Sequence, residues 1–280
     1  MTTGDDAVGP SANTDVYTHG HDRAVLRSHT WRTVDNSAAY LAPQLGAGSS
    51  LLDVGCGPAT LTVDLARRVA PGHVVGIDVA SILATAQATV DAASDAVDVE
   101  LREGDVYRLQ FDDGSFDVVH AHQVLQHLSD PVAALREMHR VCRPGGLVAA
   151  RDSDYGAFRW WPAAPALDAW LELYHEVTRA NGAEADAGRH LLAWASAAGL
   201  SEVTLTSSTW VFATPEERSW WAGLWSERIA AASTFGRRAI ELGAATASDL
   251  AELSEGWLAW AAHDDACFFV PHGEFVVVRT

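Results

Sequence analysis

The 280-residue sequence predicts an α/β protein with a doubly wound, mainly parallel sheet of about seven strands. Three observations support this fold class. Short apolar runs alternate with amphipathic stretches through the first half of the chain. Glycine or aspartate follows each of the first three apolar runs within three residues, as is typical of strands whose carboxyl ends bind a ligand. Ten of the eleven tryptophans lie between Trp160 and Trp260, which predicts an added aromatic region after the sheet.

The expected elements follow one another in a regular order. One helix is expected over residues 22–41, ahead of the first strand. Five strands are expected at 51–54, 73–77, 97–101, 116–121 and 147–150. Helices over 61–69, 82–93 and 131–141 connect them, so the crossovers should be right-handed. Two later strands are expected at 203–212 and 267–279, with tryptophan-rich helices inserted between them.

The composition excludes several classes of function. Asp and Glu number 37 against 19 Lys and Arg, and the net charge of −18 repels nucleic acids and anionic membranes. The chain has no lysine, which excludes Schiff-base enzymes and typical P-loop NTPases. Its three cysteines are widely spaced, so a disulfide framework or a thiolate zinc site is not expected. With neither a signal-peptide pattern nor a long apolar run, we expect a cytoplasmic protein.

Polar residues gather where the predicted strands end. Gly55-Cys56-Gly57 follows the first strand, and its glycines allow a ligand to approach the backbone closely. Asp78 ends the second strand, where a carboxylate can accept both hydroxyl groups of a ribose. Gly104-Asp105-Val106 follows the third strand, where an acid can accept from an adenine amino group. The sequence therefore predicts a nucleotide-containing ligand at this edge of the sheet.

A nicotinamide-dependent oxidoreductase is one alternative. Its dinucleotide fingerprint requires a third glycine, and Thr60 stands at that position. This departure disfavours the nicotinamide cofactor and leaves it as an alternative.

Five ordered motifs resemble a known family. Residues 51–57 resemble the first motif of class I S-adenosylmethionine-dependent methyltransferases. Gly76-Ile77-Asp78 resembles their ribose-binding motif, and Gly104-Asp105-Val106 resembles the adenine-binding one. Residues 116–131 and 143–146 are similar to the UbiE-like branch, named for ubiquinone and menaquinone biosynthesis. The resemblance covers residues 45–155 and implies a Rossmann-like cofactor-binding core there.

The resemblance also implies residue roles. The turn at Gly55 to Gly57 would contact the methionine part of S-adenosylmethionine, and His122 would line the pocket beside the methyl group. A helix before the first strand would close over the cofactor, with Tyr17 stacking on it and Arg27 or Arg32 pairing with its carboxylate. The expected cofactor-binding residues are Tyr17, Arg27, Asp53, Gly55, Cys56, Gly57, Asp78, Val79, Gly104, Asp105, Val106 and His122.

Metal binding is not expected. The histidine pairs His19/His21 and His120/His122 each lack a clear third ligand.

The expected domain organisation is a disordered tail over residues 1–15 and a single methyltransferase domain over 16–280. Within that domain, residues 156–200 and 213–265 would form a lid for the acceptor. An aromatic lid suits a small apolar or aromatic acceptor. No nucleic-acid or membrane partner is expected, and the protein would be a monomer or a homodimer.

The implied reaction is methyl transfer that leaves S-adenosylhomocysteine. We expect in-line displacement promoted mainly by positioning. If the acceptor needs deprotonation, the candidate catalytic residues are His122, Asp154 and Tyr155. A non-catalytic cofactor-binding protein is a further alternative.

Overall fold

The computed structural model describes residues 15, 18, 23–93 and 97–280. Of the tail predicted over 1–15, residues 1–14 lie outside the described residues, as do Tyr17, His19 and His21. The eight strands are β1 Leu51–Val54, β2 Val74–Asp78, β3 Val99–Glu103, β4 Phe116–His122, β5 Cys142–Ser153, β6 Arg159–Trp161, β7 Thr204–Phe212 and β8 Cys267–Val278. The α-helices are α1 Arg23–Thr30, α2 Val34–Ser37, α3 Thr60–Val69, α4 Ala80–Asp91, α5 Pro131–Val141, α6 Pro165–Ala180, α7 Ala187–Ala197, α8 Pro215–Arg228, α9 Thr234–Glu241 and α10 Ala247–Ala261.

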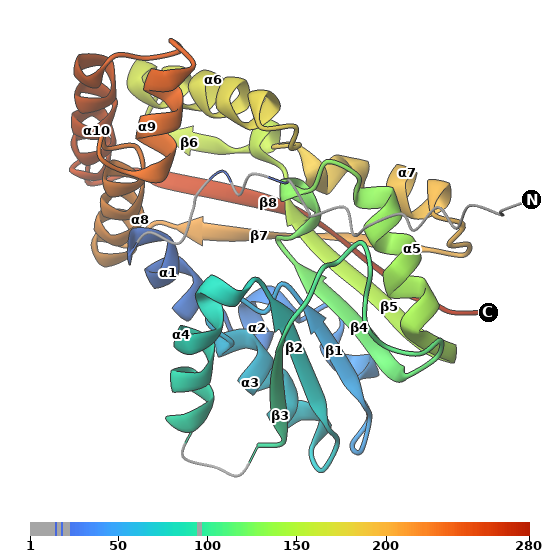
Figure 1. Cartoon of the computed structure of the whole chain (residues 1–280). Coiled ribbons are helices and arrows are strands. Elements are labelled where there is room, and N and C mark those ends of the chain that lie inside the picture. The colour runs from blue at the N-terminus through green and yellow to red at the C-terminus, as the bar shows by residue number, and fades with distance from the viewer. Residues whose placement is uncertain (1–14, 16–17, 19–22, 94–96) are drawn as a thin grey trace, which may run out of the picture.

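All eight strands belong to one sheet, which confirms the predicted fold class (Figure 1). The order is β3-β2-β1-β4-β5-β8-β6, and β7 also pairs with β8. The first five strands are parallel, whereas β8 runs antiparallel to β5, β6 and β7. The chain order reverses beside β1, so the carboxyl ends of β1, β2 and β4 open on the crevice where ligands bind in such sheets.

Strand β6 is the element that the sequence prediction lacks. It has three residues and pairs with the start of β8, Trp161 lying opposite Cys267. Such a short segment shows no alternation of apolar and polar residues from which a strand could be inferred.

The single helix expected over 22–41 is wrong. The chain forms α1, breaks at Thr33 and starts again as α2. The Thr33 side chain accepts from the backbone N–H of Asn36, and the Asn36 side chain accepts from the backbone N–H of Thr33. This reciprocal capping box begins a new helix and lets α1 run in a different direction.

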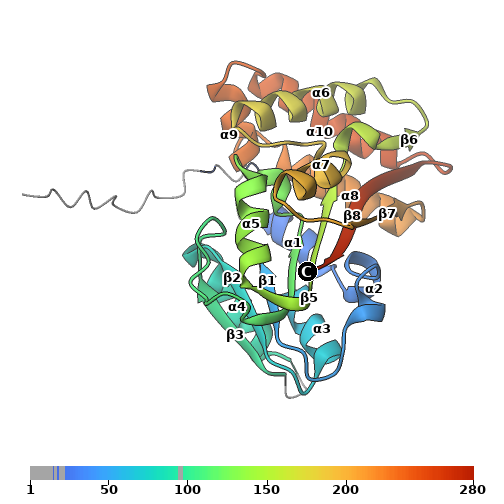
Figure 2. The ribbon, with the colours of Figure 1, turned by 90° about the vertical axis from the view of Figure 1, so that its right-hand side faces the viewer.

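Both faces of the sheet are covered because successive strand residues point to opposite sides. Leu51 belongs to a buried cluster with residues of α2 and α3, whereas Leu52 belongs to a cluster with α5 and α7. A third cluster lies under α6, α8 and α10 and is dominated by buried tryptophans. These helices and α9 form the cap at the end of the sheet where β7 and β8 extend beyond β1 (Figures 1 and 2).

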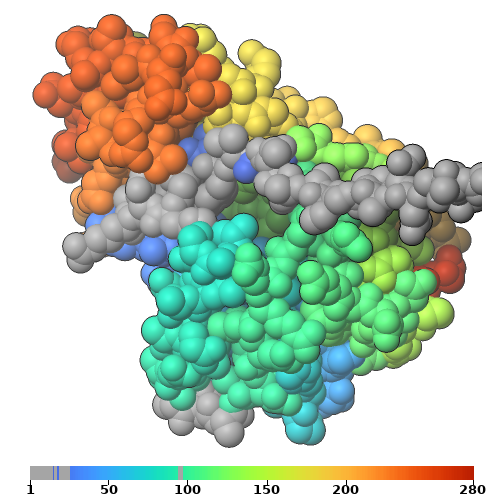
Figure 3. All heavy atoms as spheres, viewed as in Figure 1, coloured from blue at the N-terminus to red at the C-terminus, as the bar shows by residue number. Residues whose placement is uncertain are grey.

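The cap lies beside the edge of the sheet where the parallel strands end and ligands bind. In the space-filling view the cap helices α9 and α10 stand above the segment that contains α4, and α1 is partly visible between them (Figure 3). Helix α1 also packs against α8 and α3. None of the described helices combines the length and the apolarity that crossing a membrane requires.

Candidate active site

A cavity of about 190 Å³ opens at the carboxyl ends of β1, β2 and β4. Residues of the predicted motifs surround it: the turn after β1, the end of β2, and the segments that follow β3 and β4. The lining residues are Asp15, His29, Arg32, Asp53, Val54, Gly55, Cys56, Gly57, Pro58, Thr60, Leu61, Ile77, Asp78, Val79, Gly104, Val106, His122, Gln123, Val124, His127 and Leu128. We call it the cofactor pocket.

The glycine turn after β1 forms one wall of the pocket. Gly55 and Gly57 have φ angles of +70° and +55°, in the left-handed region that favours glycine. A Cβ atom at Gly55 would also overlap the side chain of Val124. The Gly55 and Cys56 N–H groups donate to the Ile77 carbonyl at 2.8 and 3.0 Å, which fixes the turn against β2. Burial raises the pKa of the Cys56 thiol, so this cysteine is no nucleophile.

Asp78 connects the end of β2 to the glycine turn. Its Oδ2 accepts from the Gly57 N–H at 2.7 Å, and its Oδ1 accepts from the Val79 N–H at 2.7 Å. The carboxylate is only partly buried and borders the pocket. It therefore holds the turn in place and still offers lone pairs to a ligand hydroxyl group.

Asp53 lies beneath the turn, on β1. Only 3% of its surface is exposed, and register places His120 of β4 beside it. Its Oδ1 is 2.9 Å from Nδ1 of His120, and its Oδ2 accepts from the Thr62 hydroxyl at 2.7 Å. The side chain thus joins β1, β4 and α3 below the pocket.

The residues after β3 divide between two positions. Gly104 and Val106 line the pocket, but Asp105 is not among the lining residues. The Asp105 Oδ1 accepts from the Tyr107 N–H at 3.0 Å. Asp15, which sequence analysis did not single out, lies in the pocket wall, and its Oδ2 accepts from the Tyr107 hydroxyl at 2.5 Å.

The two candidate arginines lie in different places. Arg27 is not a lining residue of the pocket, and its Nη2 pairs with the Glu227 Oε1 of α8 at 2.7 Å. Arg32 lines the pocket and donates to the Gln123 Oε1. Of the pair considered for the cofactor carboxylate, the structure brings Arg32 to the site and turns Arg27 towards the cap.

Gln123 is a site residue that the sequence prediction missed. It follows β4 with a φ angle of +55°. Its Nε2 donates to the Ser153 hydroxyl at 2.7 Å and lies 3.0 Å from Nε2 of His272. An ordinary glutamine in the sequence carries no signal of this conformation, which tertiary contacts impose.

His122 lies at the inner end of the pocket with 4% of its surface exposed. Burial, with the charges of Arg32 and Arg151, holds the pKa of His122 well below its usual range. Its ring stacks 6.5 Å from the ring of His272 and lies 6.0 Å from that of Trp210. A neutral imidazole with so low a pKa lines the pocket and is a weak base.

A second, smaller cavity of about 30 Å³ adjoins the first, and we call it the aromatic chamber. Its walls come from α1, the ends of β4 and β5, β7 and the cap helix α8. The lining residues are Ser28, His29, Trp31, Arg32, Gln123, Gln126, His127, Ser153, Tyr155, Phe158, Trp210, Trp220, Trp221, Arg228 and Val270.

Tyr155 and Asp154 lie on opposite sides of the loop after β5. Tyr155 borders the chamber and stacks on Tyr174 and Phe158 with ring centroids 4.0 and 4.4 Å apart. Asp154 lines neither cavity; its Oδ2 accepts from Arg189 Nε at 2.8 Å.

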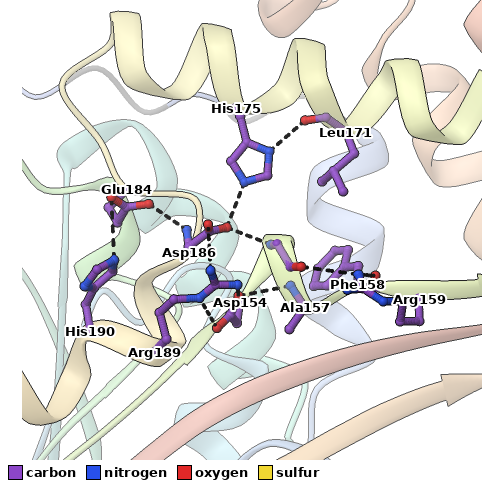
Figure 4. Close-up of polar contacts among 11 residues, drawn as sticks. Asp154, Ala157, Phe158, Arg159, Leu171, His175, Glu184, Asp186, Arg189 and His190 are labelled. Atoms are coloured by element: carbon purple, nitrogen blue, oxygen red, sulfur yellow. Dashed lines mark hydrogen bonds and ion pairs between the residues drawn. The ribbon is translucent and has the colours of Figure 1, made fainter.

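Asp154 belongs to the polar network shown in Figure 4. The adjacent Asp186 accepts from the Gly156 N–H and contacts His175 Nε2, both at 2.7 Å. These contacts fix the loop to α6 and α7. Asp154 therefore positions Tyr155 from outside the site.

Among the described residues, no group of three or more His, Cys, Asp or Glu side chains is arranged to hold a metal ion.

Comparisons with known proteins agree with this geometry. A family model described as a methyltransferase domain matches residues 52–150. An uncharacterized methyltransferase of Schizosaccharomyces pombe is 32% identical over 274 residues, which cover 93% of this chain and 95% of that protein. A demethylmenaquinone methyltransferase of Listeria monocytogenes is 32% identical over 133 residues, which cover 47% of this chain and 52% of that protein.

Solved structures show the same fold. A Haemonchus contortus phosphoethanolamine N-methyltransferase, solved with phosphomonomethylethanolamine and S-adenosylhomocysteine, superposes with a TM-score of 0.56 at 19% identity. The superposition covers 94% of this chain and 58% of that chain. With the glycine turn, Asp78 and the strand order in place, the chain belongs to the class I S-adenosylmethionine-dependent methyltransferases and is related to their UbiE-like branch.

Proposed function

We propose that this methyltransferase acts on a small apolar or aromatic acceptor that binds in the aromatic chamber. The observation that carries the proposal is the direct junction of the two cavities. His29, Arg32, Gln123 and His127 line both of them. A molecule in the chamber and a cofactor in the pocket would therefore meet at a shared wall.

The pocket residues fit S-adenosylmethionine. The glycine turn leaves room for a ligand against the backbone, Asp78 offers a carboxylate to ribose hydroxyls, and Arg32 offers a guanidinium to the amino-acid carboxylate. When bound, the cofactor supplies a methyl group that its positively charged sulfur already activates. The chain's main contribution is to align the acceptor and exclude water, and such positioning lowers barriers by about 7–11 kcal/mol.

The aromatic walls favour a flat or apolar acceptor. Trp31 contacts Trp210 and Trp220 with ring centroids 5.0 and 5.6 Å apart, and Phe158 is 1% exposed. These side chains exclude water and offer ring faces to a bound aromatic group. The chamber has room for about two water molecules, so the acceptor must displace side chains as it enters. Trp31, at 37% exposure, and Trp220 stand where α1 meets the cap.

None of the three candidate bases has the properties of one. Asp154 pairs with Arg189 outside both cavities, and His122 is neutral with a lowered pKa. Burial raises the pKa of Tyr155, which makes its phenolate harder to form. We therefore propose that positioning, without a general base from these residues, accounts for the transfer.

An acceptor screen tests the proposal. Purified protein, S-adenosylmethionine and a panel of small aromatic and aliphatic acceptors are incubated, and S-adenosylhomocysteine formation is measured. We expect turnover with an aromatic acceptor, a several-fold higher KM in Trp220→Ala, and an unchanged affinity for S-adenosylhomocysteine in that variant.

Two outcomes contradict the proposal. Turnover that is insensitive to Trp220→Ala places the acceptor elsewhere. Tight cofactor binding with no turnover on any acceptor supports a non-catalytic binding protein instead.

A further inference from the structure

One wall of the aromatic chamber is formed by a glutamine whose backbone is firmly held. Gln126 is 3% exposed and lies in the short 3-10 helix Leu125–His127 that follows β4. Its N–H donates to the Asp152 Oδ1 of β5 at 3.2 Å. Its carbonyl accepts from the Glu184 N–H, between α6 and α7, at 3.0 Å. The side chain therefore starts from a fixed position at the chamber wall.

The two atoms at the end of this amide differ in their surroundings. The Gln126 Nε2 lies 3.0 Å from Nε2 of His127. Burial, together with the charge of Arg32, lowers the pKa of His127 to about 3, so the ring is neutral and its Nε2 can accept from the amide. The Gln126 Oε1 is buried and has no hydrogen-bond partner within the described parts of the chain. The amide is thus left with one acceptor that nothing satisfies.

The chamber also contains a donor that lacks an acceptor. Trp221 of α8 is 5% exposed, and among the described residues its indole Nε1 has no partner. Its ring stacks on Phe212 with ring centroids 4.4 Å apart, which holds the indole in one orientation. A buried N–H or C=O group without a partner is destabilising. Both groups therefore favour a ligand that pairs with them.

The size of the chamber limits the kind of ligand group that can do this. Since there is room for about two water molecules, one small polar group can serve both side chains. A hydroxyl group donates and accepts at once, whereas an ionised carboxylate only accepts and would leave the amide oxygen unpaired. An apolar group would exclude solvent from both side chains and replace neither hydrogen bond.

We propose that Gln126 and Trp221 bind a neutral hydroxyl group of the acceptor, which donates to the Gln126 Oε1 and accepts from the Trp221 Nε1. Both residues line the chamber, and neither lines the cofactor pocket. The bound hydroxyl is therefore distinct from the atom that receives the methyl group at the shared wall. The substrate class is an aromatic compound with a hydroxyl group besides its methylated position. This inference rests on the proposed function, because it assigns a ligand group to the same chamber.

Two probes of matched shape test the inference. 2-Naphthol carries a neutral hydroxyl where 2-methylnaphthalene carries a methyl group, and the affinity of each is measured by equilibrium dialysis against protein saturated with S-adenosylhomocysteine. We expect 2-naphthol to bind about tenfold more tightly, because it alone pairs with both side chains. Without those partners the order should be the reverse, since burying an unpaired hydroxyl is costly.

Variants assign the preference to the two side chains. Gln126→Met keeps the length of the side chain but removes its acceptor, and should abolish or reverse the preference for 2-naphthol. Trp221→Phe keeps an aromatic ring but removes the N–H, and should reduce the preference to a few-fold. Gln87→Met is the matched control. Gln87 is exposed on α4 and binds the Asp91 Oδ1 at 2.8 Å, so its replacement should leave the preference unchanged.

The outcomes distinguish this inference from the function on which it rests. Equal affinities in the wild type, tighter binding of 2-methylnaphthalene, or a preference that survives unchanged in Gln126→Met overturn the inference. If Gln126→Met does not fold, an unchanged preference in Trp221→Phe overturns it instead. If Trp220→Ala weakens binding of both probes, the acceptor chamber stands and only the hydroxyl assignment is at issue. If neither probe binds, or neither is affected by Trp220→Ala, both proposals fail.

Discussion

At the scale of single residues, Asp53 shows how the pocket is held from below. Its two oxygens bind His120 and Thr62, and all three side chains are buried. Replacing Asp53 by alanine leaves two buried polar groups without their partner. We expect Asp53→Ala to lower the free energy of unfolding by about 2 kcal/mol or more, measured by urea denaturation.

A suitable control for this substitution is Asp91→Ala at the exposed end of α4, where Asp91 binds Gln87. Its effect should stay within about 0.5 kcal/mol. Equal losses in the two variants would contradict a supporting role for Asp53.

Asp152 gives a prediction about pH. This residue of β5 is fully buried, and burial raises its pKa to about 7. Since an unfolded aspartate has a pKa near 3.9, the folded state holds the proton between these values. The contribution of Asp152 to stability is therefore present at low pH and is lost as the pH rises through about 7.

Asp152→Asn removes this titration. The stability of the wild type relative to the variant should fall between about pH 4 and about pH 7 and stay level above that, measured as the difference in urea unfolding free energy. A difference that does not change with pH would show that Asp152 ionises normally in the folded protein.

The sequence identifies site residues unevenly at this scale. Gly55, Gly57 and Asp78 were found because the turn and the strand end need those residue types. Gln123 and Gln126 were not found, because a glutamine acquires its role here from distant contacts. Gln123 meets His272, which lies 149 positions later in the chain.

At the scale of elements, the parallel strands were predictable and the details of their ends were not. The predicted bounds of β1, β2 and β4 agree with the structure to within one residue, whereas β3 lies at 99–103 instead of 97–101 and β5 extends from 142 to 153 instead of 147 to 150. At its carboxyl end β5 is extended by pairing with β8, which runs from Leu147 to Ser153, and at its start Cys142 pairs with Phe116 of β4. Pairing between strands so far apart in the chain leaves no local pattern.

The predicted lid helices have a larger structural role than covering a site. Trp225 is 1% exposed, and its ring lies 4.4 Å from that of Trp170 and 5.9 Å from that of Trp257. Helices α6, α8 and α10 therefore share one core. Trp225→Ala should lower the free energy of unfolding by about 3–5 kcal/mol, measured by urea denaturation.

Trp161 is a suitable control for this cavity-forming substitution. It lies on β6 with 58% of its surface exposed. Trp161→Ala should cost less than about 1 kcal/mol. If Trp225→Ala cost as little, the cap would be a loosely packed lid and not a second core.

At the scale of the whole molecule, the sheet and the tryptophan-rich cap meet at the aromatic chamber. The sheet supplies the cofactor pocket, the tryptophan core supplies the chamber, and α1 lies between them, against both α3 and α8 (Figure 1). The sequence predicts both regions from motif order and tryptophan content. Their junction through Arg32, Gln123 and His127 depends on how the regions pack, which no local pattern encodes.

The most direct test of the central claim is calorimetric titration of the protein with S-adenosylhomocysteine. We predict micromolar binding to the wild type and an affinity about 10- to 100-fold lower in Asp78→Ala. The variant lacks the carboxylate that would bind the ribose and that accepts from the Gly57 N–H. Arg228→Gln, in the chamber, should bind like the wild type. Equal affinity in wild type and Asp78→Ala would contradict the claim that the cofactor lies at the end of β2.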